Sequence, residues 1–424
     1  MKKMNTLNGL QGFLRLWASQ TVSALGTAMT EYALVIWVYG QRGTASSVTL
    51  LTLCTFLPTI LFRFAGGVLA DHWDKRRVML AADLAAACGT LAVLILHQMS
   101  ALRVWHLYLI NALLSLMNAV QAPAAFVATS LLVPQEHYVR VGGLQGFSGA
   151  AVSILAPALG SVLLGVGGLS TVLACDLASF AVAFVTLLFF IRIPNPERQA
   201  EANETPILRS CLDGLRFLRS HAAMLRVTLF MTAVNFLAKL GGDGMLAPFV
   251  LSRTENDQRA LAAVQSCVAV GLLVGGLLAT AMKPARRKER LVYAACALIF
   301  VGDVVEGLSP RPWVWCAAVL FTYLVAAVMN ANLTAFMREQ VPLEMQGRVF
   351  AAKDTLQNGA IPLGLLLGGV LADGVFGPLM AGAPPALAKV FGAGNGAGIA
   401  LMFAVVGMTG IGLSLWRLKG CMKR

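Results

Sequence analysis

Twelve apolar segments, each about as long as a membrane-spanning helix, follow one another along this chain of 424 residues. A helix that crosses the hydrocarbon core of a bilayer needs about 20 mostly apolar residues. Only 12 % of the residues are charged, whereas a soluble protein usually carries about a quarter. The sequence therefore predicts an all-α membrane protein with twelve transmembrane helices, near residues 15–40, 46–70, 77–97, 104–131, 143–167, 170–192, 224–251, 260–282, 290–308, 313–337, 354–376 and 396–416.

The lysines and arginines are distributed unevenly between the loops on the two sides of these segments. Of the 33, 25 lie in one set of loops and ends, six lie in the opposite loops, and Arg63 and Lys239 lie within predicted spans. Cytoplasmic loops carry the excess of Lys and Arg in membrane proteins. We therefore expect a multi-pass protein of the cell (inner) membrane with both termini in the cytoplasm. The net charge of +13 then reflects topology, so no nucleic-acid partner is expected.

Two motifs recur at nearly the same spacing, which indicates an internal duplication. The pattern V-P-x-E-x-x-x-R-V occurs at residues 133–141 and again at 341–349, an offset of 208 residues. The run Gly-Gly-Val-Leu-Ala at 66–70 matches Gly-Gly-Leu-Leu-Ala at 275–279, an offset of 209. Parallel six-span repeats of this kind are known in transporters. The chain is therefore expected to consist of two six-helix pseudo-repeats.

The longest polar stretch separates the two repeats. It contains one apolar helical face and one basic face, the residues being Leu208, Leu212, Leu215 and Leu218 against Arg209, Arg216 and Arg219. This pattern predicts an amphipathic helix on the cytoplasmic membrane surface, which tethers the two halves. We expect an N-terminal bundle at 1–192, a linker at 193–223 and a C-terminal bundle at 224–424.

The loop after the second span reads G-V-L-A-D-H-W-D-K-R-R over residues 67–77. This sequence resembles the cytoplasmic loop motif of the major facilitator superfamily, although Asp74 stands where the family often has Gly. The resemblance implies the major facilitator fold and a latch that holds the two halves together in one conformation. Asp71 and Arg76 would be its active members, and the full set would be Gly67, Asp71, Lys75, Arg76, Arg140 and Arg348.

Other segments are similar to drug:proton antiporters of the macrolide-efflux type within this superfamily. They are residues 340–350, 368–373 and 391–394. The antiporter motif of the fifth span, built around Gly-Pro-x-x-Gly, reads here Ala156-Pro157-Ala158-Leu159-Gly160 and lacks its first Gly. The resemblance implies an efflux antiporter that works by alternating access.

Apart from Arg63, three ionisable residues lie well inside predicted spans, where a charge costs about 2.5–3.5 kcal/mol on insertion scales. They are Glu31, Lys239 and Asp243. In the resembled fold, spans 1, 4, 7 and 10 line the central cavity, so all three are candidates for proton coupling. Burial disfavours the ionised form of a carboxyl group, so Glu31 could load and release a proton. Alternatively, Glu31 reaches the outer interface, and Lys239 and Asp243 form a structural ion pair.

Uncharged amides on spans 4 and 10 are candidates for the substrate cavity. They are Asn111, Asn118, Gln121, Asn330 and Asn332. Such amides either bind a substrate or join helices by hydrogen bonds. A further set of carboxylates falls near predicted span ends and is expected to lie at the membrane interface: Asp83, Asp176, Asp303, Glu306 and Asp373.

The sequence lacks the motifs that mark several other classes of function. There is no G-x-x-x-x-G-K-[ST] phosphate loop for ATP, no H-E-x-x-H, and none of the eight cysteines forms a C-x-x-C pair. We expect no cofactor, no metal and no enzymatic activity. The prediction is a monomeric secondary transporter that exports amphiphilic, drug-like small molecules in exchange for protons. The alternatives are export of a siderophore, lysolipid or metabolite, or a non-transporting receptor or assembly factor on the same fold.

Overall fold

The computed structural model describes residues 2–133, 138–191, 193, 215–282, 285, 287–342, 346–392, 394 and 396–422. Throughout these residues the structure is helical and contains no strand. The chain divides into two compact units: residues 1–41 with 51–202 form unit 1, and residues 42–50 with 203–424 form unit 2. Each unit is described by itself.

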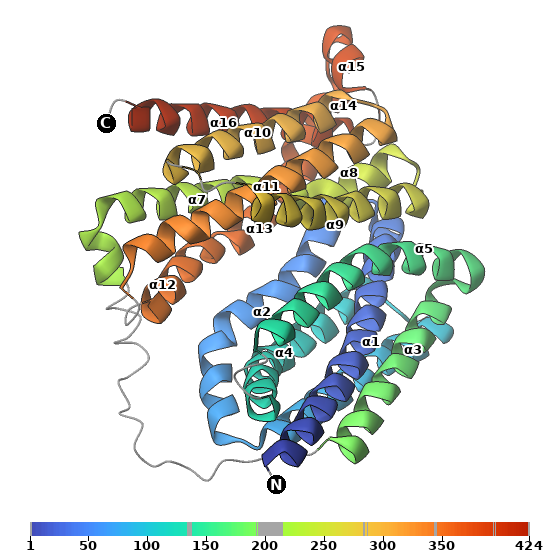
Figure 1. Cartoon of the computed structure of the whole chain (residues 1–424). Coiled ribbons are helices and arrows are strands. Elements are labelled where there is room, and N and C mark those ends of the chain that lie inside the picture. Colours follow the sequence, from blue (N-terminus) through green and yellow to red (C-terminus); the bar gives the residue numbers. More distant parts are fainter. Residues whose placement is uncertain are drawn as a thin grey trace. The chain divides into compact units, whose positions relative to one another are not determined.

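The helices of the first half, of which Figure 1 labels α1 to α5, lie in unit 1 except for residues 42–50. They are α1 (Lys2–Arg42), α2 (Ala45–His72), α3 (Lys75–Gln98), α4 (Val104–Leu132), α5 (Tyr138–Val185) and the π-helix η2 (Thr186–Phe190). The helix α3 packs against both α4 and α5. The first residues of α2 group with unit 2 and the rest with unit 1.

The described residues contain eleven helical segments that are long and apolar enough to cross a membrane. One of them is α5 with η2, and α5 alone has 48 residues, about 70 Å of helix, which is more than twice the thickness of a bilayer core. It breaks at Gly167 and Gly168, where Gly168 has a φ of +68° that favours glycine. This segment therefore supplies two spans, and the twelve predicted spans are confirmed.

Unit 2 contains the helices of the second half. They are α7 (Ala222–Leu240), η3 (Asp243–Met245), α8 (Leu246–Arg253), α9 (Gln258–Ala281), α10 (Lys288–Leu308), α11 (Pro312–Gln340), α12 (Gln346–Gly359), α13 (Ile361–Leu371), η5 (Ala372–Phe376), α14 (Gly377–Ala381), α15 (Pro385–Phe391) and α16 (Ala397–Met422). The closest packing joins α9 to α11 and α10 to both α11 and α16.

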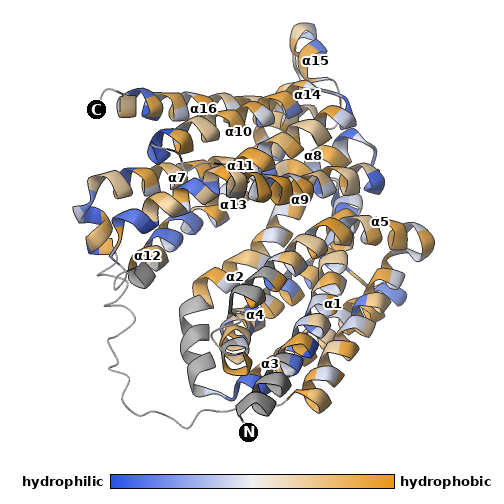
Figure 2. Cartoon of the chain, in the orientation of Figure 1, coloured by the Kyte–Doolittle hydropathy of each residue, from blue (hydrophilic) through white to orange (hydrophobic). Residues whose placement is uncertain are grey.

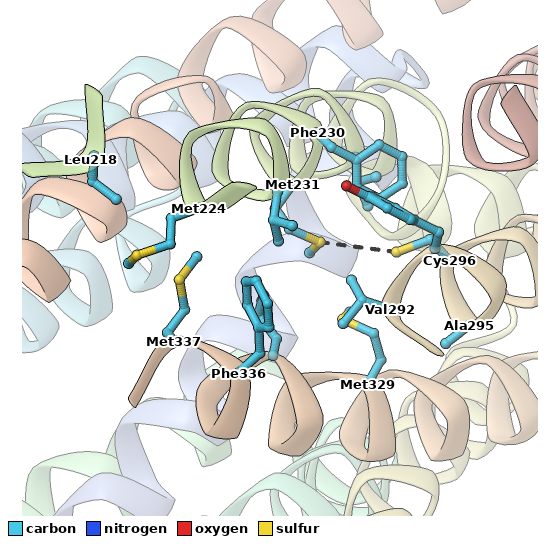
Figure 3. Packing of buried hydrophobic residues seen from close by; sticks show 14 of the residues in the cluster. Leu218, Met224, Phe230, Met231, Val292, Ala295, Cys296, Met329, Phe336 and Met337 are labelled. Carbon is cyan, nitrogen blue, oxygen red and sulfur yellow. Dashed lines mark hydrogen bonds between the residues drawn. The ribbon is translucent and has the colours of Figure 1, made fainter. Parts of the chain in front are cut away.

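The interior of unit 2 is a methionine-rich core between α7, α10 and α11 (Figure 3). Met224, Met231 and Met337 meet there, and the Cys296 Sγ lies 4.0 Å from the Met231 Sδ. All seven cysteines in the described part of the chain are free, and Cys296 packs as a small hydrophobe.

The core of unit 2 also receives the end of the predicted amphipathic linker. Residues 215–220 are helical, and Leu218 is fully buried. Leu208 and Leu212 of that prediction lie outside the described residues.

Most of the helices consist largely of hydrophobic residues (Figure 2), and many of their large apolar side chains are exposed. Val166, Phe126 and Phe189 are each more than two thirds exposed. Apolar exposure on this scale is unfavourable in water and fits contact with lipid chains. The structure is therefore that of a multi-pass membrane protein.

Candidate functional site

A cavity of about 410 Å³ lies inside unit 1, between α1, α3, α4 and the second half of α5. Four residues that the sequence predicts as site residues line this unit-1 cavity: Glu31, Asn111, Asn118 and Gln121. Helical periodicity explains the grouping on α4, because residues 111, 118 and 121 recur at intervals of seven and three and so share one face. The tertiary structure adds two carboxylates to the cavity, Asp83 from α3 and Asp176 from α5.

Asp83 is held in place by two amides from neighbouring helices. Gln20 Nε2 donates to Asp83 Oδ2 at 3.2 Å, and Gln121 Nε2 donates to Asp83 Oδ1 at 2.7 Å. The side chain of Asp83 is only 4 % exposed, so these donors replace water around its carboxylate. Gln121 thus joins α4 to α3 and lines the cavity at the same time.

Asp176 is buried more deeply, at 1 % exposure, and its two oxygens differ. Thr30 and Thr90 donate their hydroxyls to Oδ2 at 2.9 Å and 3.2 Å. No hydrogen-bond partner from the described residues reaches Oδ1. Gly26 allows α1 to approach this carboxylate, since a Cβ at Gly26 would lie 2.8 Å from Oδ1. A buried polar atom without a partner is unusual and marks this end of the cavity as a candidate binding position.

Glu31 follows Thr30 on α1 and interacts electrostatically with Asp176. Its side chain is exposed, in contrast to Asp83 and Asp176, and it lines a second, smaller cavity beside α2 as well. Glu31 is therefore the carboxylate of the unit-1 cavity that a solute or water can reach most easily.

The charge of the cavity lining is one-sided. Among the described residues, the lining includes the carboxylates of Glu31, Asp83 and Asp176, and no lysine, arginine or histidine. The remaining lining consists of amides, hydroxyls and apolar side chains such as Leu173 and Phe180. Such a lining favours a solute with an apolar body and a positive charge.

The other predicted amides have different surroundings. Asn111 Nδ2 donates to Leu107 O of its own helix at 2.9 Å, while Asn118 is exposed. Asn330 and Asn332 lie on α11 in unit 2 and are not among the described residues that line the unit-1 cavity. Asn332 Nδ2 likewise donates to its own helix, to Val328 O at 2.9 Å.

Lys239 and Asp243 form an ion pair in unit 2, with Nζ 2.6 Å from Oδ2. The sequence suggests that they lie four positions apart on one continuous helix. In the structure, however, α7 ends at Leu240, and Asp243 begins the short helix η3. The predicted seventh span is thus interrupted by Gly241 and Gly242, and the ion pair crosses the interruption.

The expectation that the carboxylates near span ends face the interface is wrong for four of the five. Asp83, Asp176, Asp303 and Glu306 are all less than 7 % exposed. Asp303 and Glu306, on α10, interact electrostatically with each other and with Asp243. The depth of a residue along a helix does not decide which face it occupies, and these residues face neighbouring helices. Asp373 is exposed.

Among the predicted latch residues, Arg76 has the clearest contacts. Its Nε donates to Leu187 O at 3.2 Å, and its Nη2 donates to Leu188 O. These carbonyls belong to η2, so Arg76 holds the end of span 6 within unit 1. Asp74 caps α3, because its Oδ1 accepts from Arg77 N at 2.9 Å.

The remaining latch residues are less completely described. Lys75 is buried at the start of α3. Gly67, Asp71, Arg140 and Arg348 lie on helices, but the structure does not describe their contacts.

In the described part of the chain, no three His, Cys, Asp or Glu residues are arranged to hold a metal ion.

The comparison with known proteins agrees with this architecture. Macrolide efflux protein A of Streptococcus pyogenes is 27 % identical over 379 residues, which cover 88 % of this chain and 92 % of that protein. The enterobactin exporter EntS of Citrobacter koseri is 26 % identical over 287 residues, 67 % of each protein. A solved structure of a mutant of the nucleoside transporter NupG superposes with a TM-score of 0.72 at 13 % identity, and the match covers 95 % of this chain and 99 % of NupG.

The likeness to NupG concerns the fold alone. The family model described as Major Facilitator Superfamily matches residues 16–365, which is most of the chain. This match agrees with the twelve spans in two units and with the internal duplication. The chain is therefore a transporter of the major facilitator superfamily.

Proposed function

We propose that this transporter exports amphiphilic small molecules in exchange for protons. The observation that carries the proposal is the unit-1 cavity, in which three carboxylates meet an apolar wall and no basic side chain of the described residues takes part. Its volume of about 410 Å³ falls in the range of ordinary small-molecule sites. The similarity to a macrolide efflux protein supports an amphiphilic cargo.

Proton and cargo compete for binding to the Glu31 carboxylate. The side chain of Glu31 is exposed, whereas Asp83 and Asp176 are buried. Two amides hold the carboxylate of Asp83, and two hydroxyls hold one of the two oxygens of Asp176. A protonated Glu31 repels no anion and attracts no cation, while the ionised form attracts a cationic cargo. Cargo binding then displaces the proton, and re-protonation from the acidic side displaces the cargo. Alternating access of the two bundles, 1–192 and 224–424, converts this competition into exchange.

Lys239 and Asp243 are the second candidates for coupling. Asp243 already has a cationic partner, so a proton that binds to it has to compete with Lys239. Glu31 has no basic residue beside it among the described residues of the unit-1 cavity and is therefore the first to test.

The decisive experiment is transport in proteoliposomes with an imposed proton gradient, on wild type, Glu31→Gln and Glu255→Gln. Glu255 is exposed and stands at the turn before α9, outside the cavity, so its variant is the matched control. We expect Glu31→Gln to insert and fold, to lose uphill export, and to retain downhill exchange. Full gradient-driven export by Glu31→Gln would refute the assignment and move attention to Asp243.

Export of a siderophore is the alternative that a relative favours, since an enterobactin exporter is similar over two thirds of the chain. Lysolipids, other metabolites and a non-transporting receptor remain further alternatives. A susceptibility panel in an efflux-deficient host, with cationic, neutral and anionic compounds, separates the cargo classes. A receptor would give no flux of any compound in proteoliposomes.

The proposed orientation puts both termini and the linker in the cytoplasm. Reporter fusions at Glu204 and Arg424 should then give a cytoplasmic signal, and a fusion at Asp257 should give an outer signal. A cytoplasmic signal at Asp257 would overturn the orientation and with it the direction of export.

A further inference from the structure

A pocket of about 200 Å³ lies inside unit 2, where α7 and α10 begin and α16 ends. The helices α10 and α16 run side by side there (Figure 1). This unit-2 pocket is smaller than most sites for whole small molecules, which measure roughly 300–1,000 Å³. Its size suits a single charged group. With the proposed orientation, the three helix ends that form it lie at the cytoplasmic surface of the membrane.

Two arginines that line the unit-2 pocket have donors to spare. The guanidinium of Arg226, on α7, makes no hydrogen bond or ion pair with another described residue. The guanidinium carbon of Arg417, on α16, lies 4.7 Å from the centre of the Trp416 ring. The Nε of Arg417 is buried and has no hydrogen-bond partner among the described residues. Buried polar atoms without a partner are unusual, so these donors mark a position for an anion.

The inner wall of the pocket is fixed by the core of unit 2. Tyr293 is buried, and its ring packs edge-on against Phe230 with the ring centres 4.8 Å apart. Its hydroxyl donates to Glu289 Oε1 at 3.0 Å. Arg290 Nη2 donates to Cys421 O at 3.1 Å and so ties the end of α16 to the start of α10. The pocket is therefore formed before any ligand enters it.

The charges of the lining indicate the kind of anion. Among the described residues the lining holds two arginines and one carboxylate, that of Glu289, which gives a net charge of one positive unit. A phosphodiester carries one negative charge, whereas a free phosphate monoester carries nearly two at neutral pH. Guanidinium groups bind phosphate oxygens through paired, charge-assisted hydrogen bonds. The lining therefore matches a phosphodiester better than a monoester.

The side chains at the rim indicate that this phosphodiester belongs to a lipid. Trp416 lines the pocket and is 64 % exposed, and its neighbour Leu415 is exposed as well. Tryptophan is enriched at the interface between membrane and water. The cytoplasmic leaflet carries anionic lipids, and basic pockets between helix ends bind their headgroups.

We propose that the unit-2 pocket binds the headgroup of an anionic phospholipid such as phosphatidylglycerol. The phosphate lies between Arg226 and Arg417, and the acyl chains lie along the exposed side chains of Leu415 and Trp416. The site belongs to unit 2 alone, and it depends neither on protons nor on the identity of the cargo.

The thiol of Cys421 reports whether the pocket is occupied. Cys421 lines the pocket and is free, so a bound headgroup should shield it from N-ethylmaleimide. The full-length protein is purified in detergent, and modification is followed by mass spectrometry of the peptide that contains Cys421. Cys88, which is exposed on α3, is the internal reference. Phosphatidylglycerol at ten times its dissociation constant should slow the modification of Cys421 about tenfold. Phosphatidylcholine with the same acyl chains has no net charge and should have little effect.

Four variants test which residues hold the headgroup, through the concentration of phosphatidylglycerol that halves the rate at Cys421. Arg226→Gln and Arg417→Gln should each raise this concentration about tenfold, because each removes a charge-assisted hydrogen bond. Glu289→Gln removes the negative charge from the lining and should lower it. Arg219 is exposed on residues 215–220 and is not among the described residues that line the pocket, so Arg219→Gln is the matched control and should change nothing.

Three results would overturn the proposal. Equal protection of Cys421 by phosphatidylcholine would show that the pocket does not select an anion. Equal protection by glycerophosphoglycerol, the same headgroup without acyl chains, would show that the ligand is a soluble phosphodiester. An equal loss in Arg219→Gln and Arg226→Gln would mean that surface charge in general attracts the lipid. If Arg417→Gln does not fold, Arg226→Gln and Glu289→Gln still decide, because their expected effects have opposite signs. The proposed function is judged separately, by Glu31→Gln in proteoliposomes.

Discussion

Neutralising Glu31 should weaken the binding of a cationic cargo and leave the binding of an uncharged analogue unchanged. The perturbation is Glu31→Gln, which keeps the length and nearly the volume of the side chain and removes one of the three charges of the unit-1 cavity. Asp83 and Asp176 keep their hydrogen bonds, so the shape of the cavity is retained.

The expected magnitude follows from the size of the cavity. A sphere of 410 Å³ has a radius of about 4.6 Å, so a cationic group inside it stands about 5 Å from the Glu31 carboxylate. At that distance two unit charges attract by about 0.8 kcal/mol at the dielectric constant of water and by about 3 kcal/mol at an effective constant of about 20. The loss in affinity should therefore lie between about fourfold and about 200-fold.

The assay is calorimetric titration of the purified transporter with a matched pair of amphiphiles, one with a quaternary ammonium group and one with a neutral group on the same apolar skeleton. Glu255→Gln serves as the control for removal of a distant charge. An equal loss for both probes would mean that the Glu31→Gln substitution distorts the cavity. No loss for the cationic probe would mean that the cargo charge lies elsewhere, and either result would refute the electrostatic reasoning.

Three further predictions concern the pair in unit 2, the cavity wall and the cytoplasmic latch. Lys239→Ala should destabilise the protein by about 1 kcal/mol, because it leaves the Asp243 carboxylate without its partner, and adding Asp243→Ala should restore part of the lost stability. A double variant that is less stable than Lys239→Ala in thermal unfolding would contradict the pairing. Gln121→Leu should cost about 2 kcal/mol, since Asp83 loses one of its two donors, and Asp83→Asn in the same protein should recover some of the loss in melting temperature. Asp71→Asn should slow turnover and leave cargo binding intact, which would be disproved by an unchanged transport rate.

The amino-acid sequence by itself determined the helices and the family. Hydropathy and periodicity are local properties, so the twelve spans could be predicted, including the pair that the structure joins through Gly167 and Gly168. The loop motif and the repeats identified the superfamily, which the family model confirms. Glu31 and Gln121 were found as cavity residues because a polar group in an apolar helix is conspicuous in one sequence.

The tertiary structure alone decided which other polar groups join them. Asp83 and Asp176 stand near predicted span ends, and nothing local shows that amides and hydroxyls from α1, α3 and α4 surround them. The same holds for Asp373, which accepts from the backbone N–H groups of Ala45 and Ser46, more than 300 residues away in the chain.

The physical reason is that hydropathy reports how deep a residue lies in the membrane, while its function depends on the face that it presents. That face is set by contacts between helices, such as the close approach at Gly26 and Gly369, where the absence of a side chain decides which backbones meet. Such contacts join residues far apart in sequence, so they became visible only when the helices were packed.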